Sequence, residues 1–359
     1  MMVEPHGRAE ELVLHIGTGK AGSKSIQAFL RANRRRLAEG GLLYPTTPGV
    51  PRHMRLGLFI KSTESIERAP AWRSQKESDP ARFRRVFRRR LLSEIEDSGL
   101  PRVLLSDEVL FHQDDASLRR LRRLTGRMAD STRLVVYLRR QDDHMVSRYQ
   151  QGIKTGKVLR LQEWAKGDHS LLYDYHARLR AWQRLQKPTD IVVRRFEPAA
   201  FVDGSLYQDF LDAAGIDARA EDLETVTNRN PSLDAETVEF LRLLNVYRVE
   251  SEGARAGLID NRGLVSPLAE GSTGPTLTLP ERTLDEFMSR WEESNRRVAR
   301  EFLHDETGEL FRAPRRTRNT TTEQRLDPAR LDHYLELLDL PEQVHAPLRQ
   351  VAEREAKTR

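Results

Sequence analysis

The stretch from Leu12 to Leu30 combines glycines, lysines and hydroxyl side chains in an order that suits anion binding. It reads LVLHIGTGKAGSKSIQAFL, an apolar β-prone run, a glycine loop and then a sequence with helical periodicity. The first amides of a helix have no intrahelical partner, and the helix dipole adds partial positive charge at that end. Lys20 adds a full positive charge, and Ser23 and Ser25 add hydroxyls. The segment therefore predicts a cradle for a phosphate-like anion.

The loop differs from the loop that binds nucleoside triphosphates. Gly17 and Gly22 have the spacing of that motif, but Ser23 stands where the motif needs its lysine. A P-loop nucleotide kinase is one alternative function, and Asp107 would then have to imitate its magnesium-binding aspartate. A tight turn between a strand and a helix, without any ligand, is another interpretation of the same residues.

A second candidate anion site follows the apolar run from Leu134 to Leu138 in RLVVYLRRQDDHMVSRYQQ. Such a run is typical of a strand that is buried on both faces of a parallel sheet. Arg139 follows it directly, and acidic residues then open a helix. A guanidinium is a permanently charged fork that suits phosphate oxygens, and a hydroxyl on the next helix, such as that of Ser147, adds a hydrogen bond. Because ligands bind at the carboxyl ends of parallel strands, both candidate groups are expected at one edge of the sheet.

These two segments together resemble the sulfotransferases that use 3′-phosphoadenosine 5′-phosphosulfate (PAPS), in particular the bacterial carbohydrate-type enzymes. The resemblance lies in a Lys-x-Gly-Ser loop after the first strand and in an arginine followed eight residues later by a serine. It covers roughly residues 10 to 245. Gly19 replaces the usual proline before the lysine, and Lys24 replaces a usual threonine or serine. The resemblance implies nine cofactor-binding residues: Lys20, Ala21, Gly22, Ser23, Lys24, Ser25, Arg139, Ser147 and Arg229.

Arg229 belongs to the segment Asn228–Ser232, which is similar to a loop that closes over the nucleotide in that family. The alternative role of the segment is an N-cap for the helix that follows, which Ser232 or Asp234 would provide.

The resemblance also implies a general base near the acceptor. Glu108 follows a predicted strand and should point into the same cleft, and relatives often carry a glutamate there. His53 lies in the irregular segment where other members of the family hold a histidine. Asp107 is a third candidate. With Lys20 as the residue that neutralises charge, the catalytic set is expected to be Lys20 with Glu108 or His53.

The implied reaction is the in-line transfer of a sulfonate from PAPS to a hydroxyl acceptor of the saccharide or glycolipid class, with 3′-phosphoadenosine 5′-phosphate (PAP) as the product. No metal is expected, because the scheme needs none. A non-catalytic nucleotide-binding module is the alternative outside enzymology. The family resemblance does not identify the acceptor.

Composition sets broader limits. The chain has 359 residues, 38% of them hydrophobic and 32% charged, with a net charge of +6 and no cysteine. Disulfides and thiolate metal sites are thus excluded, and the basic balance suits a polyanionic cofactor. Without an apolar run long enough to span a membrane or an apolar core near the first residue, a cytoplasmic protein is expected.

Strands and helices alternate through the first two-thirds of the sequence. This alternation predicts an α/β fold, a P-loop-like three-layer sandwich with a central parallel sheet between helices. The sulfotransferase domain is expected over 10–245, and 246–359 should add an irregular segment at 250–280 and C-terminal helices on the same domain. Strands are expected at 12–16, 42–45, 102–106, 134–138 and 190–193, and helices at 26–39, 54–60, 80–98, 118–128, 175–186, 205–214 and 284–303.

The expected helix at 80–98 carries an arginine-rich face opposite an apolar one. A nucleic-acid surface is one interpretation, but no aromatic residue alternates with the arginines and no nucleic-acid motif accompanies them. A solvated helix face, with no nucleic-acid partner, is the better account.

Overall fold

The computed structural model describes residues 7–72, 75, 77–226, 233–315 and 318–357. The chain divides into two compact units whose segments alternate along the sequence. The first comprises Met1–Arg140, His169–Asn228 and Trp291–Ala313, and the second comprises Gln141–Asp168, Arg229–Arg290 and Pro314–Arg359. Residue 245, where the sequence suggested a division, lies inside helix α12 (Ala235–Ser251). As a domain boundary, that division stays a prediction.

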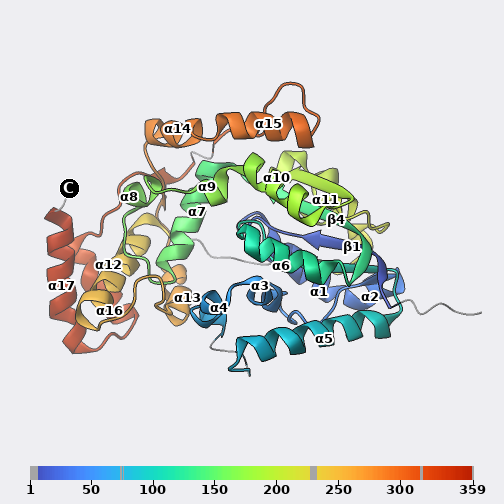
Figure 1. The fold of residues 1–359 in the computed structure, drawn as a ribbon. Helices are drawn as coiled ribbons and strands as arrows, with labels where there is room; N and C mark the ends of the chain where they lie inside the picture. Colours follow the sequence, from blue (N-terminus) through green and yellow to red (C-terminus); the bar gives the residue numbers. More distant parts are fainter. Residues whose placement is uncertain (1–6, 73–74, 76, 227–232, 316–317, 358–359) are drawn as a thin grey trace, which may run out of the picture. The chain divides into compact units, whose positions relative to one another are not determined.

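A five-stranded parallel sheet forms the centre of the first unit (Figure 1). The strand order is β2-β3-β1-β4-β5, so the first strand lies in the middle. Its residues Leu12, Val13 and Leu14 are completely buried, as expected for a strand with neighbours on both sides and helices on both faces. The strands are β1 (Ala9–His15), β2 (Leu42–Leu43), β3 (Arg102–Ser106), β4 (Ala129–Leu138) and β5 (Asp190–Arg195).

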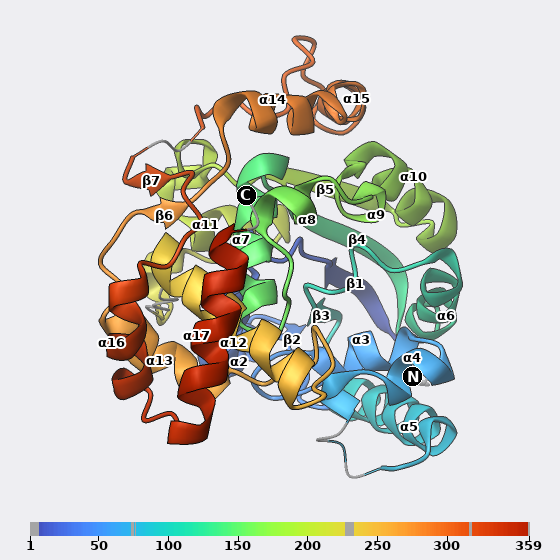
Figure 2. The same ribbon diagram turned by 90° about the vertical axis from the view of Figure 1, so that its left-hand side faces the viewer.

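Helices cover both faces of this sheet (Figure 2). One face buries Val13, Leu104 and Val135 against α1 (Ser23–Ala32), α2 (Arg34–Glu39) and α11 (Leu206–Ala213). The other face carries helices that also contact one another: α3 (Met54–Ile60), α5 (Pro80–Ser98), α6 (Asp115–Thr125) and α10 (Tyr175–Gln186). The predicted α/β fold with a central parallel sheet between two helical layers is confirmed.

Helix α5 shows why some boundaries were predictable. Pro80 opens the helix, and the carboxylate of Asp79 accepts hydrogen bonds from the amides of Ala81 and Arg82. Gly99 closes it in the left-handed conformation. Arg84 donates to the carbonyl oxygen of Lys61. The other arginines of the outer face are solvent-exposed, as expected for a solvated face.

Three predictions of secondary structure need correction. The expected helix over 26–39 is two helices, α1 and α2, because the side-chain amide of Asn33 between them donates to the carbonyls of Phe29 (2.9 Å) and Glu224 (2.8 Å). The expected helix over 284–303 is also two, α14 (Glu281–Ser289) and α15 (Glu292–Phe302), which belong to different units.

The third correction concerns the segment 250–280, which was expected to be irregular but contains helix α13 (Arg262–Glu270). Asn261, at its N-cap, donates to the side-chain oxygen of Asn245 (2.7 Å) and accepts from Arg248 (2.6 Å). These contacts with α12 stabilise the segment although its glycines, serines and proline are poor helix formers.

Helices dominate the second unit. Arg242 and Glu239 of α12 form a buried ion pair (2.7 Å), and Gln324 donates to the same glutamate (2.8 Å). Phe240 stacks on Tyr334 with ring centroids 4.4 Å apart. The remaining helices of this unit are α7 (Gln141–Ile153), α8 (Leu161–Ala165), α16 (Leu331–Leu337) and α17 (Glu342–Lys357). Nowhere in the described part of the chain is a helix both long and apolar enough to cross a membrane.

Candidate functional site

The carboxyl ends of β1 and β4 lie at a topological switch point of the sheet. The chain leaves β1 toward β2 on one side and leaves β4 toward β5 on the other. Ligands of open parallel sheets bind in the crevice outside such a point, because the loops diverge there. The Lys20 loop follows β1 and Arg139 follows β4, so the two predicted anion-binding groups of the first unit lie on the same edge of the sheet.

The β1–β4 hydrogen-bond ladder continues into the loop. The amide of Thr18 donates to the carbonyl of Tyr137 (3.0 Å), and the amide of Tyr137 donates to that of Gly17 (2.9 Å). The hydroxyl of Thr18 also donates to the carbonyl oxygen of Tyr137 (3.0 Å), and the Ser23 hydroxyl donates to the carbonyl of Thr18 (2.9 Å). Ser23 is 1% exposed, so its hydroxyl stabilises the loop through this hydrogen bond and does not reach solvent.

Two glycines of the loop have conformations or neighbours that exclude a side chain. Gly22, at the N-cap of α1, has φ +74°, and a Cβ there would lie 2.6 Å from Leu206 and 2.9 Å from Phe196. Gly17 has φ +105°, and its Cβ would lie 2.8 Å from the carbonyl oxygen of Glu108. The loop therefore needs glycine at both ends, and it packs directly against the residues that follow β3.

Arg139 and Lys20 are in direct contact. Nη1 of Arg139 donates to the carbonyl oxygen of Lys20 at 3.0 Å. Lys20 itself has φ +67°, an unusual conformation for a residue with a side chain, and the guanidinium holds its peptide group. The hydroxyl of Tyr175 donates to the carbonyl oxygen of Arg139 (2.7 Å) and fixes the end of β4. A guanidinium and a lysine-bearing anion loop are thus neighbours at the switch point.

Glu108 lies on the same edge, after β3. Its carboxylate is 3.5 Å from Nη1 of Arg52, and its side chain is 18% exposed. The loop after β3 is joined to that after β1, because the amide of Asp107 donates to the carbonyl of His15 (3.1 Å). The sequence did not identify Arg52 as part of the site, since only the packing of residues far apart in the chain brings it to Glu108.

His53 is fully buried and stacks on Tyr44. Its Nδ1 accepts from the amide of Ser106 (3.1 Å), which leaves Nε2 to donate to the carbonyl of Pro45 (3.0 Å). Burial lowers the pKa of His53 to about 3, because it penalises the charged ring. With both nitrogens bonded to the backbone, His53 has no lone pair free to accept a proton, and which residue acts as a base stays a prediction.

Asp107, the third candidate base, is 4% exposed. Burial, reinforced by the charge of Glu108, raises the pKa of Asp107 to about 7, although hydrogen bonds from the Val109 and Gly57 amides oppose the shift. Each carboxylate oxygen accepts one of those amides, at 3.1 Å and 2.9 Å. Asp107 therefore joins the backbone on the C-terminal side of Glu108 to that of α3.

The other predicted cofactor residues lie in different surroundings. Ala21 is completely buried, Ser25 half-buried and Lys24 exposed on the first turn of α1. Ser147 is half-buried in α7, which belongs to the second unit. Arg229 lies outside the described residues. The roles assigned to these residues stay predictions.

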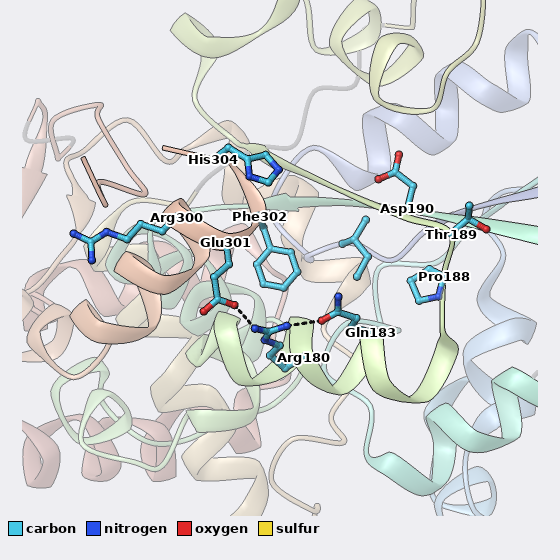
Figure 3. A pocket seen from close by; sticks show the side chains of 10 residues that line it. Arg180, Gln183, Pro188, Thr189, Asp190, Arg300, Glu301, Phe302 and His304 are labelled. Atoms are coloured by element: carbon cyan, nitrogen blue, oxygen red, sulfur yellow. Dashed lines mark hydrogen bonds and ion pairs between the residues drawn. The ribbon is translucent and has the colours of Figure 1, made fainter. Parts of the chain in front are cut away.

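A cavity of about 460 Å³ lies at the amino end of β5, away from the carboxyl edge (Figure 3). Pro188, Thr189 and Asp190 line one part of it. The guanidinium of Arg180 is paired with Glu301 (2.6 Å) and also donates to Gln183 (2.8 Å). The cavity contains none of the candidate site residues, and Arg180 is already paired with a carboxylate.

No family model matches the chain. A protein of Archaeoglobus fulgidus described as uncharacterized is 32% identical over 173 residues, which make up 48% of this chain and 46% of that protein. The chain thus spans about half the length of that relative. A crystal structure of a sulfotransferase from Alicyclobacillus acidocaldarius has a TM-score of 0.37 and 14% identity, covering 70% of this chain and 96% of that one. A likeness of this size carries no argument about function.

Proposed function

We propose that this chain is a sulfotransferase that moves a sulfonate from PAPS to a hydroxyl acceptor of the saccharide or glycolipid class. The contact between Arg139 and Lys20 is the observation that carries the proposal. It places a guanidinium beside a glycine-bounded lysine loop at the switch point of a parallel sheet. Cationic residues at the ends of two neighbouring strands suit a nucleotide that carries phosphate groups at two positions.

Each residue has a distinct task in this scheme. Lys20 and the amides at the start of α1 bind the phosphosulfate and neutralise the charge that develops on the leaving phosphate. Arg139 binds the 3′-phosphate. As the acceptor oxygen forms its bond to sulfur, the bond from sulfur to the 5′-phosphate oxygen breaks and PAP leaves. Glu108 takes the acceptor proton.

A nucleotide kinase fits the site less well. Ser23 occupies the position of the kinase lysine, and its hydroxyl is bonded within the loop. Asp107, which would have to bind magnesium, uses one oxygen on each of two backbone amides. The residues present therefore favour sulfonate transfer over phosphoryl transfer.

Thermal unfolding with added nucleotides tests the proposal. PAP should raise the unfolding midpoint because it binds only the folded chain, whereas ATP with magnesium should raise it little. Labelled PAPS should then transfer its sulfonate to a fraction of extracted polysaccharides, lipids or small metabolites. Stabilisation by ATP with magnesium but not by PAP would favour the kinase. Stabilisation by PAP without transfer to any fraction would favour a non-catalytic module.

A further inference from the structure

Three consecutive residues, the last of β3 and the two that follow it, each contact the segment 52–57, which leads into α3 and includes its first turn. The amide of Ser106 donates to His53 (3.1 Å), the carboxylate of Asp107 accepts from the amide of Gly57 (2.9 Å), and the carboxylate of Glu108 pairs with Arg52 (3.5 Å). The segment 52–57 is thereby fastened along one side of the candidate site.

Asp107 has the central position among these contacts. Its Oδ1 accepts from the amide of Val109 (3.1 Å), which closes a turn with Glu108 in the middle. Its Oδ2 accepts from the amide of Gly57, the fourth residue of α3. A single carboxylate therefore fixes the backbone of Glu108 and the helix that follows Arg52.

Gly57 makes this contact possible. Glycine inside a helix is unfavourable compared with alanine, yet α3 carries one at this position. A Cβ on Gly57 would lie 2.7 Å from Oδ2 of Asp107 and 2.5 Å from Val109. An alanine would push the helix away from the carboxylate without removing any titratable group.

We propose that Asp107 and Gly57 form a clamp that positions Glu108 and Arg52 for the reaction, with Asp107 acting through Glu108 rather than touching the acceptor. The role of Glu108 as base rests on the proposed function. The hydrogen bonds of the clamp lie within the first unit and can be tested without any substrate.

The experiment compares Asp107→Asn and Gly57→Ala with two matched controls. Asp114→Asn removes another aspartate that caps a helix, the N-cap of α6, and Gly263→Ala fills open space in α13. Hydrogen exchange at the Gly57 and Val109 amides should be at least tenfold faster in the Asp107 variant than in the native protein. In the Gly57 variant, the amide of Val109 should exchange at least tenfold faster. Neither control should change either amide by more than twofold.

Activity provides the second readout, in the acceptor fraction that the native enzyme sulfates. Both clamp variants should lower kcat at least tenfold and leave the Kd of PAP within twofold, because the Lys20–Arg139 contact is intact. Unchanged amide exchange in both variants, unchanged kcat, or an equal loss of PAP binding would overturn the clamp. If the native protein does not bind PAP, the proposed function fails, while amide exchange still decides whether the clamp exists.

Discussion

Nη1 of Arg139 lies 3.0 Å from the carbonyl oxygen of Lys20, although 119 positions separate the two residues in the sequence. The contact joins the end of β4 to the loop after β1, and these strands are hydrogen-bonded neighbours. The sheet itself therefore places Arg139 beside the Lys20 loop, so the two residues are already positioned before a ligand binds.

Replacing Lys20 by alanine should remove the cation of the loop. We expect kcat for sulfonate transfer to fall by about 10²- to 10³-fold, the usual cost of losing one preorganised stabilising group, with an unchanged thermal unfolding midpoint. Lys166→Ala, at an exposed position of the second unit, is the matched control. A kcat for Lys20→Ala close to that of the control would remove Lys20 from the mechanism.

Gly22→Ala should destabilise the first unit by more than a positive φ alone would. Gly22 and Gly99 have φ values of +74° and +60°, but only Gly22 has atoms within 3 Å of the added methyl group. Strain at a positive φ costs about 1 to 3 kcal/mol, and the clash with Leu206 and Phe196 adds to it. Urea unfolding of both alanine variants measures the difference, and equal losses would show that the loop can relax around the methyl group.

Glu108→Gln should lower kcat and abolish the acidic limb of the pH–rate profile, since an amide cannot take the acceptor proton. PAP affinity should stay within twofold. Glu96→Gln, on the exposed face of α5, controls for the loss of one negative charge. A profile with its acidic limb intact in Glu108→Gln would assign the base to another residue.

Stability should depend on pH through His53. Burial lowers the pKa of His53 to about 3 in the folded chain, whereas the pKa of a histidine in the unfolded chain is about 6.5. Between these two pH values the unfolded chain binds a proton at His53 and the folded chain does not. Acidification from pH 6.5 toward 3 therefore destabilises the fold, by up to about 1.4 kcal/mol per pH unit for this group. His15, whose pKa burial also lowers to about 3, acts in the same direction.

Urea unfolding between pH 6 and 4 measures this contribution. The free energy of unfolding of His53→Asn should fall less steeply on acidification than that of the native protein, by up to about 1.4 kcal/mol per pH unit. Asp107, whose raised pKa acts in the opposite direction, is present in both proteins and cancels in the comparison. His333→Asn, on the surface of α16, should keep the native slope. Identical slopes for His53→Asn and the native protein would mean that His53 is protonated in the fold.

The main elements could be predicted because local signals and burial agree. The strand at Arg102–Ser106 and the helices at Pro80–Ser98 and Tyr175–Gln186 have the predicted bounds. Contacts over long sequence distances caused the errors. The carbonyl of Glu224 accepts from Asn33 between two helices that look continuous in sequence, and Asn245 holds the helix that begins after Asn261.

For the candidate site, the sequence could predict which residues follow the carboxyl ends of the strands. Apolar runs followed by Lys20, Glu108 and Arg139 placed these residues at carboxyl ends, and parallel pairing places those ends together. The sequence could not show that both nitrogens of His53 bind backbone groups, or that Arg52 pairs with Glu108. Those facts depend on how the segment after β2 packs against β3, which no local pattern encodes.

The nucleotide selectivity of Arg139 variants tests the central claim most directly. Calorimetry would give the Kd of PAP and of adenosine 5′-phosphate, which lacks the 3′-phosphate, for the native protein, Arg139→Ala and Arg123→Ala, an exposed control on α6. We expect the native protein and the control to prefer PAP, and Arg139→Ala to lose about 10- to 100-fold of that preference, the value of a charge-assisted hydrogen bond. An equal preference in all three proteins, or none in the native protein, would contradict this claim.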